Sequence, residues 1–301
     1  MTAKTLISRL AVFFLGLPLM LLIAWLPYFN HLGLHVLIIL FAFLGSNELY
    51  TIFSKRIPLL PRPFLVGLSV LLPVSAAFHA VFPAITQRPL GVGQEIVTYF
   101  LIASVLLILA AEVFTAKEFS ASNARMAGSV FIVIYTGYLI TFVSRLTVFS
   151  SIINGERTSV STAYCAAFLM MVFLCDSIAW FFGVLLGRSN RGIVAASPNK
   201  SIMGFIGGLA GSMGAGALAW FIWRDVFAGS ILKMLAIGAV LAFSSIVGDL
   251  AESVFKRCAD VKDSGRAVPG RGGALDSLDS ILMSAPVFYA LVSIIYHPGL
   301  F

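Results

Sequence analysis

The chain of 301 residues is 59% hydrophobic and 11% charged, with a mean hydropathy of +1.00. This composition leaves too little polar surface for a water-soluble globule and too much apolar surface for a disordered chain, so both classes are excluded. The formal net charge of +7 comes from 20 Lys and Arg against 13 Asp and Glu. We interpret it as a signal of membrane topology and anionic lipid headgroups, and not of nucleic-acid binding.

Apolar stretches long enough to cross a bilayer, about 20 residues each, recur along the whole chain. The sequence predicts an all-α, polytopic integral membrane helix bundle with about nine transmembrane helices, forming a single membrane domain over residues 1–301. Within it, residues 1–160 form N-terminal helices and residues 161–301 carry the polar motifs. The expected spans are 10–29, 32–53, 64–84, 94–115, 127–149, 162–187, 202–223, 230–250 and 280–297.

The distribution of Lys and Arg over alternate connections sets the expected orientation. With the N-terminus inside, fifteen of the 20 basic residues fall on the inner side and five on the outer side. The first apolar stretch follows Lys4 and Arg9 and has no small-residue cleavage pattern, which favours a retained helix over a removed signal peptide. We therefore expect a cytoplasmic N-terminus and an integral protein of the inner (plasma) membrane.

Acidic residues crowd into one segment, from the end of the eighth span to the start of the ninth. Of the 13 acidic residues, six lie between Asp249 and Asp279. Asp276 and Asp279 are one helical turn apart and can share a face. Carboxylates at membrane depth need cationic neutralisation, which Mg²⁺ bound to carboxylates and substrate phosphates provides. Basic side chains and a glycine turn in the same segment favour phosphoryl chemistry, although a solvated loop with balanced charges is the alternative interpretation.

A second polar cluster lies between the sixth and seventh spans. Asp176 stands inside the sixth span, where an ionisable residue is a functional candidate and a structural hydrogen bond between helices is the alternative. Lys200 precedes a predicted helix start beside Ser197 and Ser201, an arrangement suited to an anion at a helix N-terminus. The glycines of 204–216 are expected to form a close helix-packing face. Two further acids near span ends are open between a cavity-lining and a structural role: Glu48 and Glu112.

The segment 248–280 resembles the signature of the phosphatidate cytidylyltransferases, or CDP-diacylglycerol synthases. Segment 197–208 is similar to a second element of that family, and Asp176 with Ala179 and Trp180 to a third. Three positions depart from the family pattern and bear on turnover more than on fold: Arg271 replaces a His, Ser277 an Arg and Met203 a Glu. The signature residues present are Ser253, Lys256, Arg257, Lys262, Asp263, Gly265, Pro269, Gly270, Gly272, Gly273, Asp276 and Asp279.

This resemblance implies that CTP and phosphatidic acid react to give CDP-diacylglycerol and pyrophosphate at the cytoplasmic face, with 161–301 as the catalytic half. It also implies a homodimer in the lipid bilayer, and Mg²⁺ as the metal, leaving open a second divalent or a monovalent cation. By analogy with two-metal sites, metal ligands are expected at Asp249, Asp276, Asp263 and Asp279. The expected catalytic residues are Asp249, Asp276, Lys200, Lys256 and Arg257. The expected substrate-binding residues are Ser197, Ser201, Ser253, Lys262, Arg271, Gly272, Gly273 and Asp176.

Three other functions remain open from the residues. A related CTP-dependent enzyme acting on a polyprenyl lipid would share the polar residues and differ in the lipid cavity. A catalytically impaired paralogue would bind CTP or lipid without turnover, in keeping with the three departures. A transporter would use the intramembrane acids as an ion pathway, but the charges gather on one side and no inverted repeat is visible.

Overall fold

The computed structural model describes residues 17–88, 90, 91, 93, 95–153, 155–268 and 272–298. Eight helical segments in these residues are long and apolar enough to cross a membrane, and they coincide with the second to ninth expected spans. The first expected span, 10–29, is described from residue 17 onward, where it contains α2 (Leu17–Trp25), and its residues 10–16 lie outside the described residues. The prediction of a helical membrane protein is confirmed.

The chain divides into two compact units. The first comprises the described residues of Met1–Pro27, Leu146–Val254 and Asp279–Phe301, and the second those of Tyr28–Arg145 and Phe255–Leu278. Two helices contribute to both units: α10 (Ile231–Cys258) and α11 (Leu275–Tyr296).

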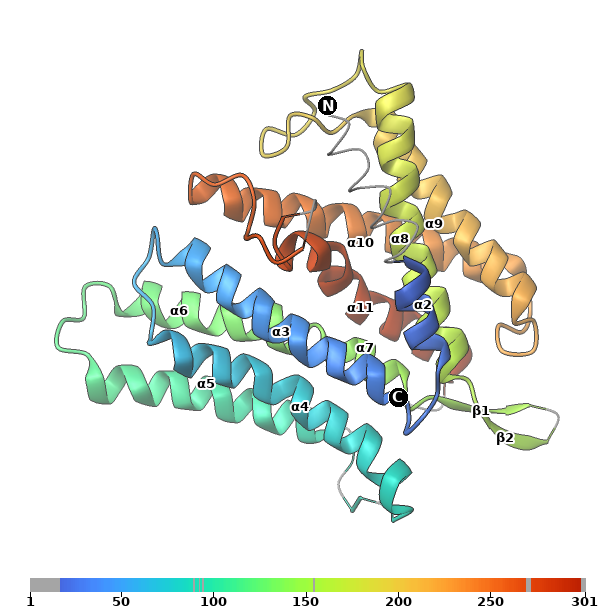
Figure 1. Ribbon diagram of the computed structural model, residues 1–301, viewed down its shortest axis with the longest axis horizontal. Helices are drawn as coiled ribbons and strands as arrows, with labels where there is room; N and C mark the ends of the chain where they lie inside the picture. The colour runs from blue at the N-terminus through green and yellow to red at the C-terminus, as the bar shows by residue number, and fades with distance from the viewer. Residues whose placement is uncertain are drawn as a thin grey trace. The chain divides into compact units, whose positions relative to one another are not determined.

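The second unit is a layer of neighbouring helices. In Figure 1, α3, α4, α5 and α6 run alongside one another. The ion pair between Arg125 of α6 and buried Glu112 of α5, 2.9 Å long, joins two of them. The last expected span of this unit is interrupted, because a π-helical turn, η2, separates α6 from α7. The bounds are α3 (Leu32–Phe53), α4 (Arg62–Thr86), α5 (Glu95–Thr115), α6 (Ser122–Ile132), η2 (Val133–Tyr138) and α7 (Thr141–Leu146).

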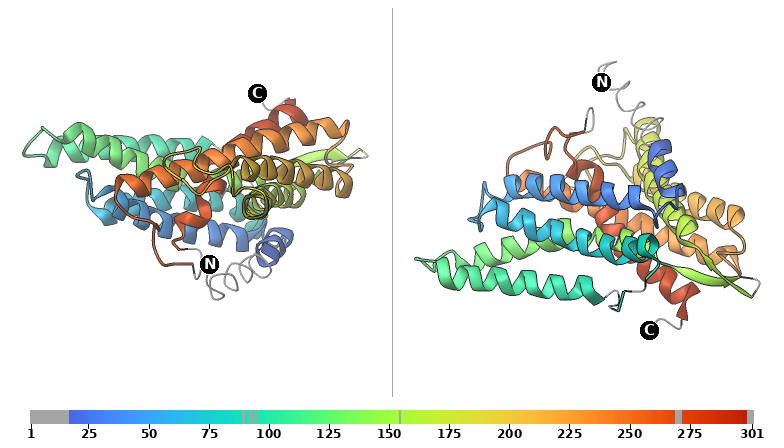
Figure 2. Two further views of the ribbon diagram at one scale, coloured as in Figure 1. Left: turned by 90° about the horizontal axis from the view of Figure 1, so that it is seen from above. Right: turned by 60° about the horizontal axis from the view of Figure 1, so that its bottom comes forward.

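The first unit is built around α8 (Ser161–Leu185) and α9 (Ile202–Ile222), which lie side by side in both sets of views (Figure 1, Figure 2). A short antiparallel hairpin, β1 (Ser150–Ile153) and β2 (Glu156–Ser159), precedes α8. The sequence did not predict this hairpin. Gly155 has a φ of 86°, which is favourable for glycine at such a turn.

Two helices extend beyond the expected spans 230–250 and 280–297. α10 continues to Cys258 because 251–258 contains helix-forming residues, and Lys256 and Arg257 in its last turn complement the helix dipole. α11 begins at Leu275, with Asp276 in its first turn, where an acidic residue is favoured. The signature residues at these ends therefore lie on helices and not in a loop.

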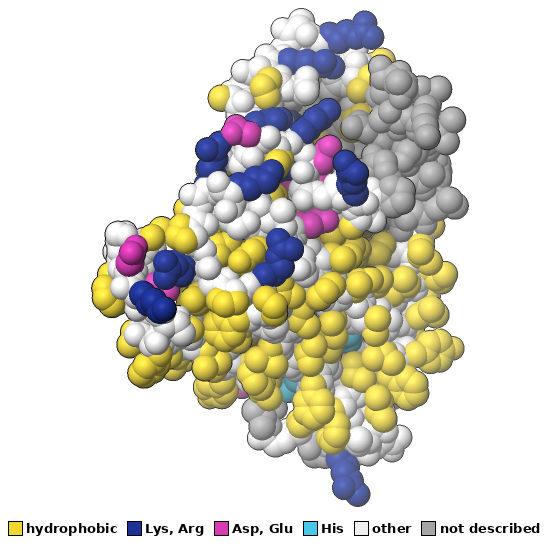
Figure 3. Space-filling model, turned by 60° about the vertical axis from the view of Figure 1, so that its left-hand side comes forward, with side chains coloured by type: hydrophobic (Ala, Val, Ile, Leu, Met, Phe, Trp, Pro, Cys, Tyr) yellow, Lys and Arg dark blue, Asp and Glu magenta, His cyan; other side chains and the backbone are white. Residues whose placement is uncertain are grey.

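Exposed side chains on the helices are largely apolar, as expected where they meet lipid. On α5, for example, Leu106, Val113 and Phe114 are 59%, 69% and 86% exposed. Hydrophobic side chains form a broad continuous area of the face drawn in Figure 3. This surface agrees with a chain whose solvent is the bilayer.

The predicted glycine packing face is confirmed where α9 meets α8. A Cβ at Gly211 would lie 2.5 Å from the carbonyl oxygen of Leu174 and 3.0 Å from Cβ of Ile178, whereas one at Gly214 would meet nothing within 4 Å. Small residues allow such close approach of helix backbones in membranes.

We expect Gly211→Ala to lower the free energy of unfolding by about 1 to 3 kcal/mol, because the added methyl group overpacks the α8–α9 contact. Gly214→Ala on the same helix is the matched control and should be neutral or stabilising by up to about 1 kcal/mol. Unfolding in one detergent, followed by circular dichroism, measures both. Equal effects would contradict this account of the packing.

Candidate active site

The first unit contains the Lys200–Asp249 ion pair. Lys200 lies in the segment between α8 and α9, and its ammonium binds the carboxylate of Asp249 on α10. Both side chains are about 30% exposed, so the pair is partly open to ligands. Two residues expected at the site from distant parts of the sequence thus lie together in the structure.

Two more predicted acids belong to this first-unit cluster, which we define as Asp176, Lys200, Asp249, Glu252 and Asp279. Asp279 of α11 is 7% exposed and interacts electrostatically with Asp249, Glu252 and Asp176. Glu252 is 1% exposed. Three of these carboxylates, those of Asp176, Asp249 and Asp279, act electrostatically on Lys200.

Hydroxyl groups fix the orientation of Asp176 on α8. Its Oδ1 accepts hydrogen bonds from the hydroxyls of Ser245 on α10, at 3.3 Å, and Ser280 on α11, at 3.2 Å. The backbone amide of Ser280 also donates to Oδ1 of Asp279, at 2.6 Å. The three helices are thus joined through the acids that the sequence predicted to be functional.

The ammonium of Lys200 responds to this surrounding charge. Burial by itself lowers its pKa, but the carboxylate of Asp249, with smaller contributions from Asp176 and Asp279, outweighs burial and leaves the pKa above its ordinary value of 10.5. Lys200 therefore stays protonated throughout the physiological pH range and can hold anionic groups.

A second cluster lies in the second unit, and we define it as Glu48, Lys256, Ser264, Gly273 and Asp276. Lys256 of α10 binds Oδ1 of Asp276 at 2.5 Å, and their side chains are 12% and 9% exposed. The Oδ2 atom of Asp276 accepts from the amide of Gly273 at 2.7 Å, and from the amide and hydroxyl of Ser264 at 3.0 and 2.9 Å. Both oxygens of Asp276 are thereby oriented.

Aromatic packing holds the end of α10 beside Lys256. Phe255 packs edge-on against Phe53, Phe131 and Tyr135, with ring centroids 5.4 to 5.6 Å apart. Edge-to-face pairs of this kind are favourable. They restrict the rotation of the last turn of α10 and so the direction in which Lys256 projects.

The glycine turn approaches the acids closely. Gly272 has a φ of 110°, and a Cβ there would meet Oδ2 of Asp276 at 2.5 Å and Cβ of Asp263 at 3.4 Å. A side chain at Gly272 would be strained and would displace Asp276. Because Gly272 has no side chain, the backbone of this turn can lie directly against the carboxylate of Asp276.

The remaining predicted residues make other contacts, are exposed, or lie outside the described residues. Ser201 is buried and caps α9, its hydroxyl accepting from the amide of Gly204 at 3.1 Å. Ser253 is buried on α10, and Ser197 is half-buried before α9. Three residues are exposed: Arg257, Lys262 and Asp263. Three residues of the signature lie outside the described residues: Pro269, Gly270 and Arg271.

The acids fit a divalent cation by their chemistry. In the described part of the chain, no three His, Cys, Asp or Glu side chains stand in a ready metal-binding arrangement. The carboxylates of the first-unit cluster interact electrostatically with one another and are the ligand type that a hard cation prefers, so a bound divalent cation stays a prediction. Asp249 and Asp276 lie in different units, and a metal centre that they share stays a prediction.

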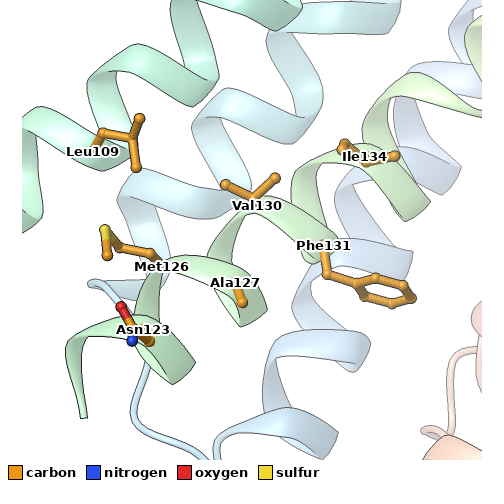
Figure 4. Close-up of a pocket in the computed structure, with 7 residues that line it drawn as sticks. All are labelled: Leu109, Asn123, Met126, Ala127, Val130, Phe131 and Ile134. Atoms are coloured by element: carbon orange, nitrogen blue, oxygen red, sulfur yellow. The ribbon is translucent and has the colours of Figure 1, made fainter. Parts of the chain in front are cut away.

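A hollow of about 500 Å³ in the second unit differs from the two polar clusters in the residues that line it. Its lining is apolar apart from one amide, and Figure 4 shows it along α6, with one residue from α5 and one from η2. The lining residues are Leu109, Asn123, Met126, Ala127, Val130, Phe131 and Ile134. It contains no acid or base, so we do not place the chemistry there.

Sequence reasoning missed three hydroxyl residues and left one acid undecided. Ser245 and Ser280 orient Asp176, but serines are common in helices and carry no distinctive signal. Ser264 between two signature residues was equally unremarkable. Glu48 was recognisable as an acid inside a span, yet only the fold connects it with segment 264–275.

Comparisons with known proteins identify the family to which this sequence is similar. The model of the cytidylyltransferase family matches residues 7–295. The phosphatidate cytidylyltransferase of Staphylococcus saprophyticus is 39% identical over 137 residues, 46% of this chain and 52% of the relative. That of Staphylococcus haemolyticus is 41% identical over 123 residues, 41% of this chain and 46% of the relative. That of Chlamydia trachomatis is 39% identical over 122 residues, 40% of this chain and 39% of the relative. The matches span about half of these relatives or less.

Proposed function

Because the chain belongs to the cytidylyltransferase family, we propose that it transfers the cytidylyl group of CTP to phosphatidic acid, giving CDP-diacylglycerol and pyrophosphate. The observation that carries this proposal is the pairing of signature aspartates with lysines: Lys200 with Asp249, and Lys256 with Asp276. The names of the relatives support the choice of substrates.

The reaction brings two anions together, so the protein must neutralise charge and align the reacting groups. An oxygen of the lipid phosphate forms a bond with the α-phosphorus of CTP, and the bond from that phosphorus to the bridging oxygen of the β-phosphate breaks. Pyrophosphate leaves with the bonding electron pair. No covalent intermediate with the protein is required.

The lysines and arginine of the signature hold the phosphates in this proposal. Lys200 and Lys256 neutralise the triphosphate, and exposed Arg257 and Lys262 contact its outer phosphates or the lipid phosphate. Divalent cations, with Mg²⁺ as the expected ion, would polarise the α-phosphate when bound. Asp249 and Asp276 would hold them, with Asp263 and Asp279 as additional or outer ligands.

Hydrogen-bonding groups complete the proposed binding residues. Ser253 and Ser197 donate to phosphate oxygens, and Asp176 marks the polar cavity that receives the lipid headgroup. Ser201 supports the site by beginning α9 after Lys200. The remaining residues of the set are Gly272 and Gly273, which precede α11, and Arg271, which lies outside the described residues.

The cellular setting follows from the basic residues and the resemblance. The excess of Lys and Arg in alternate connections supports an inner-membrane protein with its site facing the cytoplasm, where CTP is available. The acyl chains of the substrate remain in the bilayer. A homodimer is the expected assembly on the basis of the resemblance.

One assay tests the proposal. Detergent-purified protein is given labelled CTP, Mg²⁺ and phosphatidic acid, or a polyprenyl phosphate, and the lipid products are separated. We expect a cytidylylated product with phosphatidic acid that disappears with EDTA and returns with Mg²⁺. A product only with the polyprenyl lipid would contradict the substrate, and CTP binding without any product would indicate an impaired paralogue.

A further inference from the structure

Glu48 of α3 binds the start of α11 and the loop before it. Its Oε1 accepts from the amide of Ala274 at 3.0 Å, and its Oε2 accepts from the amide of Leu275 and the hydroxyl of Ser264, both at 2.9 Å. The first amides of a helix have no intrahelical partner, and a negative charge is favourable there. The carboxylate of Glu48 therefore acts as a cap supplied by another helix.

The hydroxyl of Ser264 connects this cap with Asp276. Its Oγ lies 2.9 Å from Oε2 of Glu48 and 2.9 Å from Oδ2 of Asp276. The amide of Ser264 donates to the same Oδ2 atom at 3.0 Å. A movement of Glu48 would thus be transmitted to Asp276 through one residue.

Two glycines allow the carboxylate of Glu48 to reach this position. A Cβ at Gly265 or at Gly273 would collide with the Glu48 carboxylate. Both glycines belong to the signature segment, so its spacing accommodates an acid from a helix more than 200 residues earlier, as the separation of 216 between Glu48 and Ser264 shows.

The turn after α3 holds the other end of this segment. Nε of Arg56 donates to the carbonyl oxygen of Cys258 at 2.6 Å, and its guanidinium pairs with Asp260. Arg56 lies eight positions after Glu48, in the turn that follows the end of α3 at Phe53. Helix α3, with a short extension, therefore binds both the end of α10 and the start of α11.

We propose that Glu48 is a positioning residue for the transferase reaction: it fixes the N-terminus of α11 and Ser264, and through them the orientation of Asp276. This role rests on the function proposed above. Glu48 does not contact the reacting atoms, and it acts through residues that do. Its own carboxylate is engaged by three donors.

We expect Glu48→Gln to reduce kcat by about 10- to 100-fold, as loss of an outer partner of a metal-binding residue typically does, and to raise the Mg²⁺ concentration needed for half activity. The KM for phosphatidic acid should change little. A Gln side chain offers one acceptor and places an amide group opposite backbone donors. Glu48→Asp keeps the charge and should recover part of the loss.

Hydrogen exchange measures the positioning independently of turnover. In Glu48→Gln we expect the amides of Ala274 and Leu275 to exchange at least about 10-fold faster than in the unmodified protein, since their acceptor is weakened. The control is Glu112→Gln, another buried acid of the second unit paired with Arg125, which should leave exchange in 272–276 and the Mg²⁺ requirement unchanged.

The outcomes separate this inference from the proposed function. Unchanged exchange in Glu48→Gln, or an equal effect of Glu112→Gln, would refute the positioning role. If the unmodified protein makes no CDP-diacylglycerol while hydrogen exchange responds to Glu48→Gln as expected, the proposed function is refuted. The role of Glu48 as a cap of α11 is then still supported. If Glu48→Gln does not fold, Ser264→Ala decides: it must raise the Mg²⁺ requirement and the exchange near Asp276, and no change would refute the link.

Discussion

Asp249→Asn and Asp276→Asn should each lower the formation of CDP-diacylglycerol by at least about 1,000-fold, because each removes a charge expected to hold a cation worth several kcal/mol at the transition state. Each also leaves a lysine facing a neutral amide, Lys200 in one variant and Lys256 in the other. The measurement is initial rate against Mg²⁺ concentration in detergent micelles.

Folding and charge controls accompany these variants. Asp225→Asn removes an exposed acid outside both clusters and should retain the rate of the unmodified protein. Circular dichroism and gel filtration establish that the two site variants remain folded. Full activity in either folded variant would remove that aspartate from the proposed metal site.

Lys200→Met should reduce kcat by about 100- to 1,000-fold, the loss typical when one electrostatic contact to a transition state is removed. The change also leaves Asp249 beside Asp176 and Asp279 without its paired ammonium. Lys200→Arg keeps the charge and should be intermediate, because a guanidinium differs from an ammonium in shape. Lys117→Met, in an exposed connection, is the matched control.

The pH dependence of the Lys200 pair has a definite sign. A group whose folded pKa is raised stabilises the folded protein fully below its unfolded pKa, here 10.5, and loses that contribution as the pH rises through the folded value. We therefore expect no ionisation of Lys200 in rate or unfolding profiles between pH 6 and 9. A lysine-dependent transition in that range, absent from Lys200→Met, would contradict the charge environment described.

The sequence predicted the helical spans well because hydropathy reports directly on lipid exposure. The predicted spans ended too early in α10 and began too late in α11. Lys256, Arg257 and Asp276 are polar and suggested a loop, although such residues also complement the dipoles of helix ends. The hairpin before α8 carries too few apolar residues to be recognised. Interruptions such as η2 depend on packing that periodicity does not contain.

For the candidate site, charge type and spacing identified the acids and lysines, and the two ion pairs followed only from the fold. Asp249 and Lys200 are 49 residues apart, and no pattern in one sequence links them. The contacts of Glu48 are even harder to predict from the sequence, because its partners are the backbone amides of residues 274 and 275, and every residue except proline has such an amide. A side chain that recognises backbone leaves no complementary residue in the sequence.

The continuation of α10 as a helix to Cys258 affects how Lys256 meets any anion. A lysine on a flexible loop would surrender backbone freedom on binding, at about 1 to 2 kcal/mol for each residue that becomes fixed. In α10 that freedom is already lost during folding, and Phe255 is wedged among three aromatic rings. Binding of an anion to Lys256 therefore loses less affinity to ordering of the backbone. Which anions bind depends on how far this one side chain can reach.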